Sequence, residues 1–222
     1  HVGLSRATVA RHVARCGLSR LRALDPPPPI KRYEREHPGE LIHLDIKKLG
    51  VIVRAGHRVT GVWRNRHLKG GWESVHVCID DHSRLSYVEV LPDERAATAV
   101  GFLERAVAWL GRHGVSVSRV MTDNGAAYRS RLFAASCRRL GMKHLFTRPY
   151  TPRTNGKAER FIQTSLREWA YVRAYANSAE RTKALPAWLA HYNYCRSHSA
   201  LGGHPPISRI LGPVNKVLRL DT

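Results

Sequence analysis

The sequence predicts an α/β fold, a mixed sheet of five strands flanked by helices, with a short helical segment in front of it. Three apolar, β-branched segments come first, and two of them are joined by a tight polar turn at residues 80–83. Helical and strand patterns then alternate, which is the order expected when helices cover a sheet. Four consecutive prolines at 26–29 separate this region from the N-terminal segment, because a proline run cannot form the interior of a helix.

The N-terminal segment has the features of one short helix. Ser5 is a favourable N-cap, and Gly17 is placed where it can end the helix. A capped helix of this length with a basic face is similar to the second helix of a helix-turn-helix. We therefore expect residues 1–24 to be the C-terminal part of a DNA-binding domain whose preceding helix is missing. The side chains expected to contact DNA are Arg6, Arg11 and Arg15.

The rest of the chain divides into three parts. Residues 25–40 contain the proline run and are predicted to be a stiff linker. Residues 41–176 contain all the predicted strands and form the expected core domain. Residues 177–222 are expected to hold a C-terminal helix and an irregular tail. The predicted elements are a strand at 41–53, two strands within 74–91, a helix at 93–114, a strand at 115–123, a helix at 128–140, a strand at 142–148, a helix at about 154–175 and a last helix at 184–198.

The charge of the chain indicates a polyanionic partner. There are 37 Lys and Arg residues against 17 Asp and Glu residues, a formal net charge of +20, and 29 of the 37 bases are Arg. The guanidinium fork suits phosphate, so we expect double-stranded DNA as the partner. The four cysteines are far apart and form no zinc motif. No apolar run approaches the ~18–20 residues of a membrane span, and no signal peptide is visible, so we expect a cytoplasmic, nucleoid-associated protein without a membrane.

Three carboxylates fall where sheet enzymes place their sites. Asp45 lies inside the first strand between two apolar residues. Asp123 ends the fourth strand, just before the turn at Asn124-Gly125. Glu159 begins the helix that follows the fifth strand. These three acids are the candidate catalytic residues.

Divalent cations explain why a basic chain would gather three acids. Two unpaired carboxylates ~4 Å apart repel by ~4 kcal/mol at an effective dielectric constant of ~20. Mg²⁺ prefers carboxylate oxygens and water, and two ions ~3.5–4 Å apart can bind both the attacking and the leaving oxygen of a phosphoryl transfer. The pattern therefore predicts two Mg²⁺ or Mn²⁺ ions held by Asp45, Asp123 and Glu159.

Each of these acids taken alone also has a structural explanation. An Asp before Asn-Gly is commonly a turn residue, and a Glu in a first helical turn commonly interacts with the helix dipole. The prediction therefore rests on all three together. Asp80 and Asp81 are rival acids, but they lie in a turn between strands and are expected to be structural.

These residues and their surroundings resemble the bacterial insertion-sequence transposases that have a catalytic core of the retroviral-integrase type. The similarity extends over about residues 32–211, and the 35 residues between Asp123 and Glu159 match the spacing of that family. It implies a ribonuclease H-like fold and a two-metal Asp-Asp-Glu site formed by Asp45, Asp123 and Glu159. It also implies a homo-oligomer acting on paired DNA ends. The matching segments are HLDIKKL, CIDDHSRLSYVEVLPDE, MTDNGAAY, PYTPRTNGKAERF and HYNYCRSHSALGGHPPISRI.

The resemblance implies further DNA contacts. Many relatives have a basic residue seven positions after the catalytic Glu, where this chain has Leu166. Contact with the terminal bases is therefore assigned to Gln163 or Arg167. Lys157 and Arg160 lie beside the catalytic Glu and are expected to approach DNA phosphates.

Two asparagines are expected to support the site. Asn124 turns the chain after the second catalytic acid. Asn155 precedes the catalytic helix, where it either orders the active-site loop or caps that helix.

The predicted function is DNA transposition. A metal-bound water would hydrolyse the phosphodiester at an element end, and the freed 3′-OH would attack target DNA. Two alternatives stay open at this point. One is a ribonuclease H-like nuclease that cuts without joining, and the other is an inactive remnant that only binds DNA.

Overall fold

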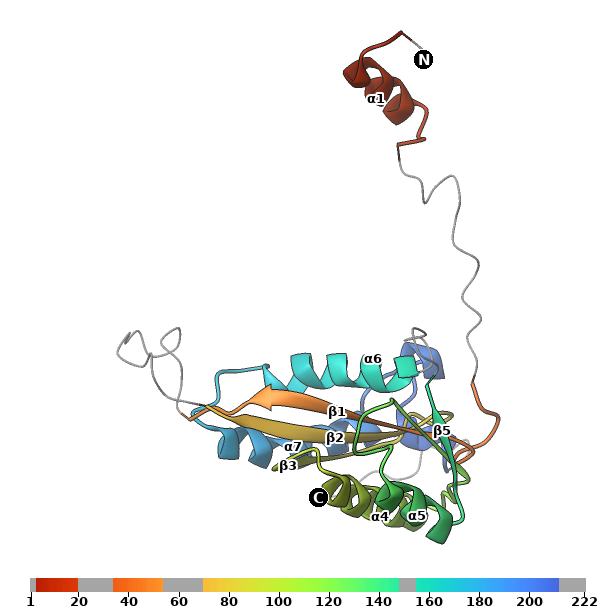
Figure 1. The fold of residues 1–222 in the computed structure, drawn as a ribbon, viewed down its shortest axis with the longest axis vertical. Coiled ribbons are helices and arrows are strands. Elements are labelled where there is room, and N and C mark those ends of the chain that lie inside the picture. Colours follow the sequence, from red (N-terminus) through yellow and green to blue (C-terminus); the bar gives the residue numbers. More distant parts are fainter. Residues whose placement is uncertain (1–2, 20–33, 54–69, 148–154, 212–222) are drawn as a thin grey trace, which may run out of the picture. The chain divides into compact units, whose positions relative to one another are not determined.

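The computed structural model describes residues 3–19, 34–53, 70–147 and 155–211 and divides into two units, residues 1–33 and 34–222. The described part of the first unit is helix α1 (Arg6–Arg15) (Figure 1). The Ser5 hydroxyl accepts a hydrogen bond from the Thr8 N–H, and Gly17 follows the helix with a φ of +70°. Both predicted ends of this helix are confirmed, whereas the helix-turn-helix itself stays a prediction.

The second unit is built on the predicted mixed sheet of five strands. The strand order is β3-β2-β1-β4-β5, with β1 antiparallel to β2, β2 antiparallel to β3, and parallel pairing of β1 with β4 and of β4 with β5. Strand β1 is therefore central, and it joins the antiparallel and the parallel halves (Figure 1). The strands are β1 (Ile42–Gly50), β2 (Trp72–Asp80), β3 (Ser86–Leu91), β4 (Arg119–Thr122) and β5 (Lys143–Phe146).

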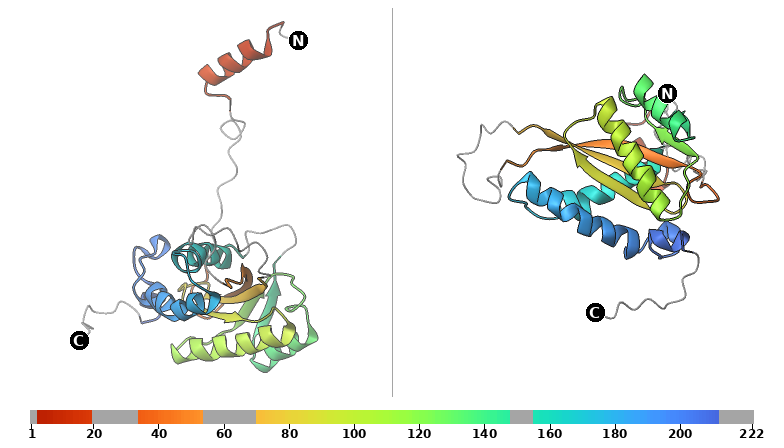
Figure 2. Two further views of the ribbon diagram at one scale, coloured as in Figure 1. Left: turned by 90° about the vertical axis from the view of Figure 1, so that its left-hand side faces the viewer. Right: turned by 90° about the horizontal axis from the view of Figure 1, so that it is seen from below.

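Helices cover both faces of this sheet (Figure 2). On one face, α4 (Ala96–Arg112) and α5 (Arg131–Arg139) enclose a core with β1 residues such as Leu44. On the other face, α6 (Gly156–Ser165) and α7 (Ser178–Tyr194) pack against β2 residues such as Val77. Because strand side chains alternate between faces, odd-numbered residues of β1 lie on the α6 side. None of the helices in the described segments is long and apolar enough to cross a membrane.

The helix predicted to run to residue 175 is shorter than expected. Helix α6 ends at Ser165 and passes into a wider π-helical turn, Leu166–Ala170. This turn buries Trp169, whose indole N–H donates to the Arg181 carbonyl over 2.8 Å. The helical pattern of the sequence continues to about residue 175, but the burial of Trp169 ends the regular α-helix earlier.

The last helix starts six residues earlier than predicted. The Asn177 side chain accepts from the Glu180 N–H, and the Glu180 carboxylate accepts from the Ala176 N–H, a reciprocal cap at the start of α7. The sequence Asn-Ser-Ala-Glu contains that signal, whereas the prediction from residue 184 onwards rests only on the later apolar residues. Two short 3-10 turns, Ser199–Leu201 and Pro206–Arg209, follow α7.

Residues 34–40, which their composition places in the linker, pack on the second unit instead. The Gly39 N–H donates to Asp80 Oδ1, and the Gly39 carbonyl accepts from the Ser118 N–H, both over 2.8 Å. Leu41 then enters the core fully buried. The proline run predicts a linker, and the contacts of Gly39 show that this linker ends before residue 40. The sequence does not indicate these contacts, because their partners, Asp80 and Ser118, are distant along the chain.

We predict that alanine is far more destabilising at Gly39 than at Gly114. Both glycines have positive φ, +81° and +75°, and this conformation alone costs a side chain about 1–2 kcal/mol. A Cβ at Gly39 would also lie 2.1 Å from the Ser116 carbonyl oxygen, whereas nothing lies within 4 Å of one at Gly114. Urea unfolding should therefore show a loss on the order of 3 kcal/mol or more for Gly39→Ala. Equal losses in the two variants would contradict the described packing of residues 34–40.

Candidate active site

The pairing of β1 with β4 brings two of the predicted acids together. The two strands are parallel, and His43 is paired with Met121. Extending this register by two residues sets Asp45 beside Asp123, which directly follows β4. Neighbouring strands lie about 4.8 Å apart. The two acids therefore lie next to each other on the two middle strands, where β4 ends.

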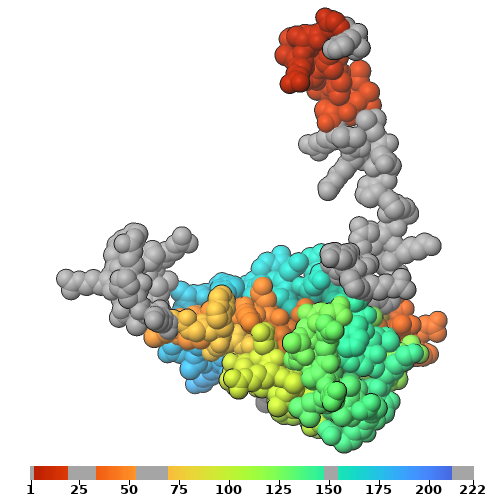
Figure 3. Space-filling model, viewed as in Figure 1, coloured from red at the N-terminus to blue at the C-terminus, as the bar shows by residue number. Residues whose placement is uncertain are grey.

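The third acid, Glu159, lies in the first turn of α6 on the same side of the sheet as Asp45. Its charge acts on Asp45, as that of Asp123 does. Burial, aided by the charges of Asp123 and Glu159, raises the pKa of Asp45 to about 6, against the lowering effects of the Ile46 N–H and Lys47. The structure therefore couples the three predicted acids electrostatically. In the space-filling view, the surface of α6 adjoins that of β1 and β2 (Figure 3).

The three acids show no ion pair with a described basic residue, although the chain is strongly basic. Within the described segments, no ion pair involves Asp45, Asp123 or Glu159. By contrast, the described acids elsewhere commonly pair with arginine, as Glu168 does with Arg196 over 2.8 Å. Like-charged groups left together without counter-charges destabilise a fold unless something else binds them.

Residues around Asp123 shape its turn. Asp123 Oδ1 accepts from the Gly125 N–H over 2.9 Å. Asn124 Nδ2 donates to the Thr147 carbonyl over 3.0 Å, so Asn124 fixes the chain after β5, which suits its predicted supporting role. The buried Tyr128 ring lies close by. Burial raises the pKa of Tyr128 well above its usual value, and the charges of Asp45 and Asp123 add to this effect.

The donor set fits hard divalent cations, because it offers three carboxylates and a site where negative charge is unfavourable without a cation. The arrangement is open, however. Across the described segments, no group of three or more His, Cys, Asp or Glu side chains is positioned to hold a metal ion. Asp45 Oδ1 accepts from the Ile46 N–H over 2.8 Å, and Glu159 is exposed.

Lys157 is not placed as predicted. Its ammonium lies 2.5 Å from Asp81 Oδ1, and its side chain is only 17% exposed. This lysine is therefore engaged inside the protein, and the phosphate contact expected from the sequence stays a prediction. No local sequence pattern indicates this partner, because Asp81 belongs to a turn far away along the chain.

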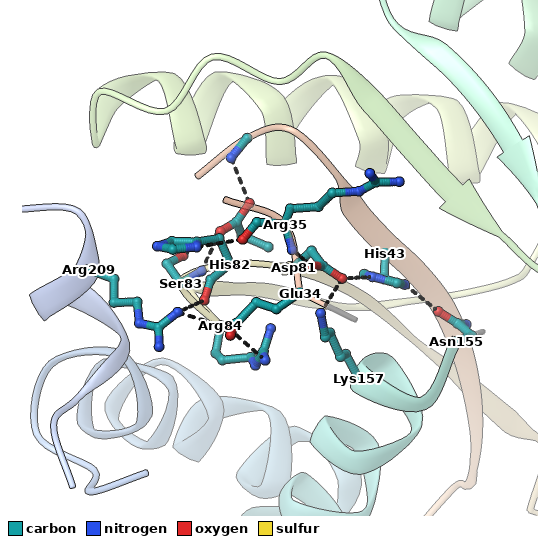
Figure 4. A network of polar contacts seen from close by, with 12 residues as sticks. Glu34, Arg35, His43, Asp81, His82, Ser83, Arg84, Asn155, Lys157 and Arg209 are labelled. Atoms are coloured by element: carbon teal, nitrogen blue, oxygen red, sulfur yellow. Dashed lines mark hydrogen bonds and ion pairs between the residues drawn. The ribbon is translucent and has the colours of Figure 1, made fainter. Parts of the chain in front are cut away.

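Asp81 is held by donors from three separate segments (Figure 4). His43 Nε2 lies 2.7 Å from Oδ1, beside the ammonium of Lys157, and the Arg35 N–H donates to Oδ2 over 2.7 Å. Burial alone raises the pKa of Asp81, but these hydrogen bonds outweigh it and hold the pKa far below its usual value. None of these contacts lies within the turn itself.

The neighbouring Asp80 is the turn residue that the sequence predicts. Its Oδ2 accepts from both the N–H and the hydroxyl of Ser83 over 2.7 Å, and its Oδ1 accepts from Gly39. The two adjacent acids therefore have different roles. Asp80 closes the turn, whereas Asp81 connects it to other elements.

Asn155 orders the site and does not cap α6 through its side chain. Its Oδ1 lies 3.1 Å from His43 Nδ1, and its Nδ2 donates to the Leu44 carbonyl over 3.4 Å. The side chain is 5% exposed. Of the two roles considered from the sequence, the structure favours ordering, because Asn155 joins the start of α6 to β1.

The remaining predicted DNA contacts lie at exposed positions. Arg160, Gln163 and Arg167 are all exposed along α6 and its π-helical extension, and Leu166 packs partly into the core. In the first unit the three predicted arginines of α1 are exposed as well. Exposure permits contact with DNA, and these roles stay predictions.

The fold agrees with comparisons to known families. Residues 35–152, more than half of the chain, match the family described as the integrase core domain, and residues 140–206 match a second family of the same description.

Two relatives come from bacterial insertion elements. The chain is 30% identical over 130 residues to a 39.2 kDa protein of insertion element IS476 from Xanthomonas euvesicatoria, covering 58% of this chain and 36% of the relative. It is 34% identical over 86 residues to a putative transposase InsD for insertion element IS2E from Escherichia coli, covering 39% of each. The chain thus spans less than two fifths of the length of these curated relatives.

Solved structures share the fold. A chain of the simian T-cell lymphotropic virus intasome, in complex with the PP2A regulatory subunit B56 gamma, matches with a TM-score of 0.63 and 19% identity, covering 99% of this chain and 76% of that chain. The HTLV-2 integrase catalytic core domain in complex with magnesium matches with a TM-score of 0.51 and 18% identity, covering 79% and 98%. The fold is therefore the ribonuclease H-like fold of integrase catalytic cores, and the chain belongs to the integrase core domain family.

Proposed function

We propose that this protein is a DNA transposase that cuts at the ends of a mobile element and joins them to target DNA. The observation that supports this most is the set of three coupled carboxylates, Asp45, Asp123 and Glu159, which lack a cationic partner in the described part of a chain with a net charge of +20. The relatives named as insertion-element proteins support the same class of activity.

The three acids are the proposed metal ligands. When bound, two divalent ions supply the positive charge that polarises the phosphate and acidifies the attacking water or 3′-hydroxyl. Asp45 and Asp123 are fixed by the central strand pair, while Glu159 approaches from a helix. The chain needs no covalent intermediate, so no serine, cysteine or tyrosine nucleophile is required.

DNA is the proposed substrate for both steps. Arg160, Gln163 and Arg167 are exposed beyond Glu159 along one helical segment, which suits contact with the element end. The arginines of α1 suit a second contact through the major groove. Oligomeric assembly on paired ends is proposed from the family and from the intasome whose fold this chain shares.

A joining assay tests the function and separates it from its alternatives. Labelled duplexes copied from the DNA on either side of the coding sequence are incubated with supercoiled plasmid and Mg²⁺ or Mn²⁺. We expect label joined to plasmid. Shortened duplex without joined product would indicate a nuclease, and a gel shift without either product would indicate a DNA-binding remnant.

We predict that Asp45→Asn, Asp123→Asn and Glu159→Gln each reduce joining by on the order of 100-fold or more, since loss of a metal ligand should exceed the loss caused by its outer-shell partners. Glu104→Gln is the matched control, because Glu104 pairs with Arg139 at the surface of α4. Joining is quantified at equal DNA occupancy. Activity retained by any of the three variants would remove that residue from the proposed site.

We also predict that Asp45→Asn stabilises the metal-free protein at high pH. The pKa of Asp45 is about 6 in the folded protein, against an ordinary value of 3.8. A raised carboxyl pKa favours the folded state at low pH, and this advantage is lost as the pH rises towards 6. The variant should therefore gain up to about 3 kcal/mol at pH 8 and much less near pH 4.

Thermal or urea unfolding in EDTA at these two pH values measures this difference. Glu104→Gln should change stability by less than about 1 kcal/mol at both. A gain in stability that does not depend on pH would show that ionisation of Asp45 does not destabilise the folded protein.

A further inference from the structure

Asp81 is a fully buried carboxylate outside the three proposed catalytic acids. Burying a carboxylate is costly unless several groups compensate it. Here the compensation comes from the segment that leads into β1, from β1 itself and from α6, through Arg35, His43 and Lys157 respectively. The neighbouring Asp80 differs, because it is held by Ser83 within its own turn and by the Gly39 N–H before β1, and none of these bonds reaches α6.

Two of these partners lie close to the proposed catalytic acids. His43 is two residues before Asp45 on the same face of β1, and Lys157 is two residues before Glu159 in the first turn of α6. Asp81 Oδ1 contacts both side chains at once. One oxygen atom therefore connects the strand that presents one acid to the helix that presents another (Figure 4).

A second contact strengthens the same connection. His43 uses its other ring nitrogen to meet Asn155 at the N-terminal end of α6. His43 and Asn155 are 0% and 5% exposed, so both are held in a dry environment where hydrogen bonds are strong. The start of α6 is thus attached to β1 through His43 on one side and through Asp81 on the other.

We propose that Asp81 is a positioning residue, which sets Glu159 against Asp45 and Asp123 by holding His43 and Lys157 together. This inference rests on the proposed function, and it assigns Asp81 no contact with metal or DNA. Its effect is to fix the first turn of α6 over β1, so that Glu159 keeps one position relative to Asp45 and Asp123.

The proposal predicts a selective loss of turnover in Asp81→Asn. In the joining assay, kcat should fall at least 10-fold, while KM for plasmid DNA stays within about 2-fold, because the exposed DNA-contacting residues are unchanged. Asp80→Asn is the matched control: it removes an equally buried neighbouring carboxylate whose bonds do not reach α6. Among folded molecules it should keep kcat within about 2-fold of the starting protein.

Hydrogen exchange gives a readout that does not depend on joining. The amides of Arg160 to Gln163 bond to carbonyls of the first turn of α6. In Asp81→Asn they should exchange at least 10-fold faster, relative to amides of α4, and in Asp80→Asn this ratio should not change. If the starting protein joins no DNA, the proposed function fails, but exchange still tests the positioning role.

A double variant tests whether Asp81 acts through its partner. If Asp81 acts through Lys157, Asp81→Asn combined with Lys157→Met should exchange no faster than Asp81→Asn alone. Additive effects, unchanged exchange in Asp81→Asn, or an equal change in Asp80→Asn would each overturn the proposal.

Discussion

The parallel pairing of β1 with β4 is the interaction on which the candidate site depends. It occurs at the centre of the sheet, where the antiparallel and parallel halves meet. Its register sets Asp45 beside Asp123, and a slip of one residue would turn Asp45 to the α4 side of the sheet. Leu44 and Ile46, which flank Asp45 in β1, pack on the α4 side. The register that buries these two residues is therefore also the one that places Asp45 beside Asp123.

Charge supplies the second constraint. With more than twice as many basic as acidic residues, the chain could neutralise every carboxylate, and it does so at the partly buried Glu73, which pairs with the buried Arg181. The absence of such pairs at Asp45, Asp123 and Glu159, in the part of the chain that the structure describes, is therefore informative. The three acids form a local excess of negative charge, which lowers the stability of the fold. Such a cluster is expected where a bound cation neutralises it.

Much of this could be predicted from the sequence, because it depends on local patterns. Alternating apolar residues gave the five strands, and the acid before Asn-Gly and the acid at a helix start gave the two later members of the site. The features that the sequence does not predict are contacts between distant segments. Nothing near Lys157 in the sequence reveals its partner Asp81. The π-helical turn that buries Trp169 is equally a product of packing, whereas the cap at Asn177 follows from the local sequence Asn-Ser-Ala-Glu.

The two adjacent acids of the β2–β3 turn show how one short segment can serve both the fold and the site. Asp80 binds Gly39 and closes its own turn, and Asp81 binds Arg35, so the same turn fixes the chain before β1 at two points. Asp81 then reaches β1 and α6 with its other oxygen. If α6 were held only by apolar packing, it could slide along the sheet, because apolar contacts are not directional. A buried charge with donors from both elements has one satisfactory geometry, and this requirement gives α6 a definite position relative to β1.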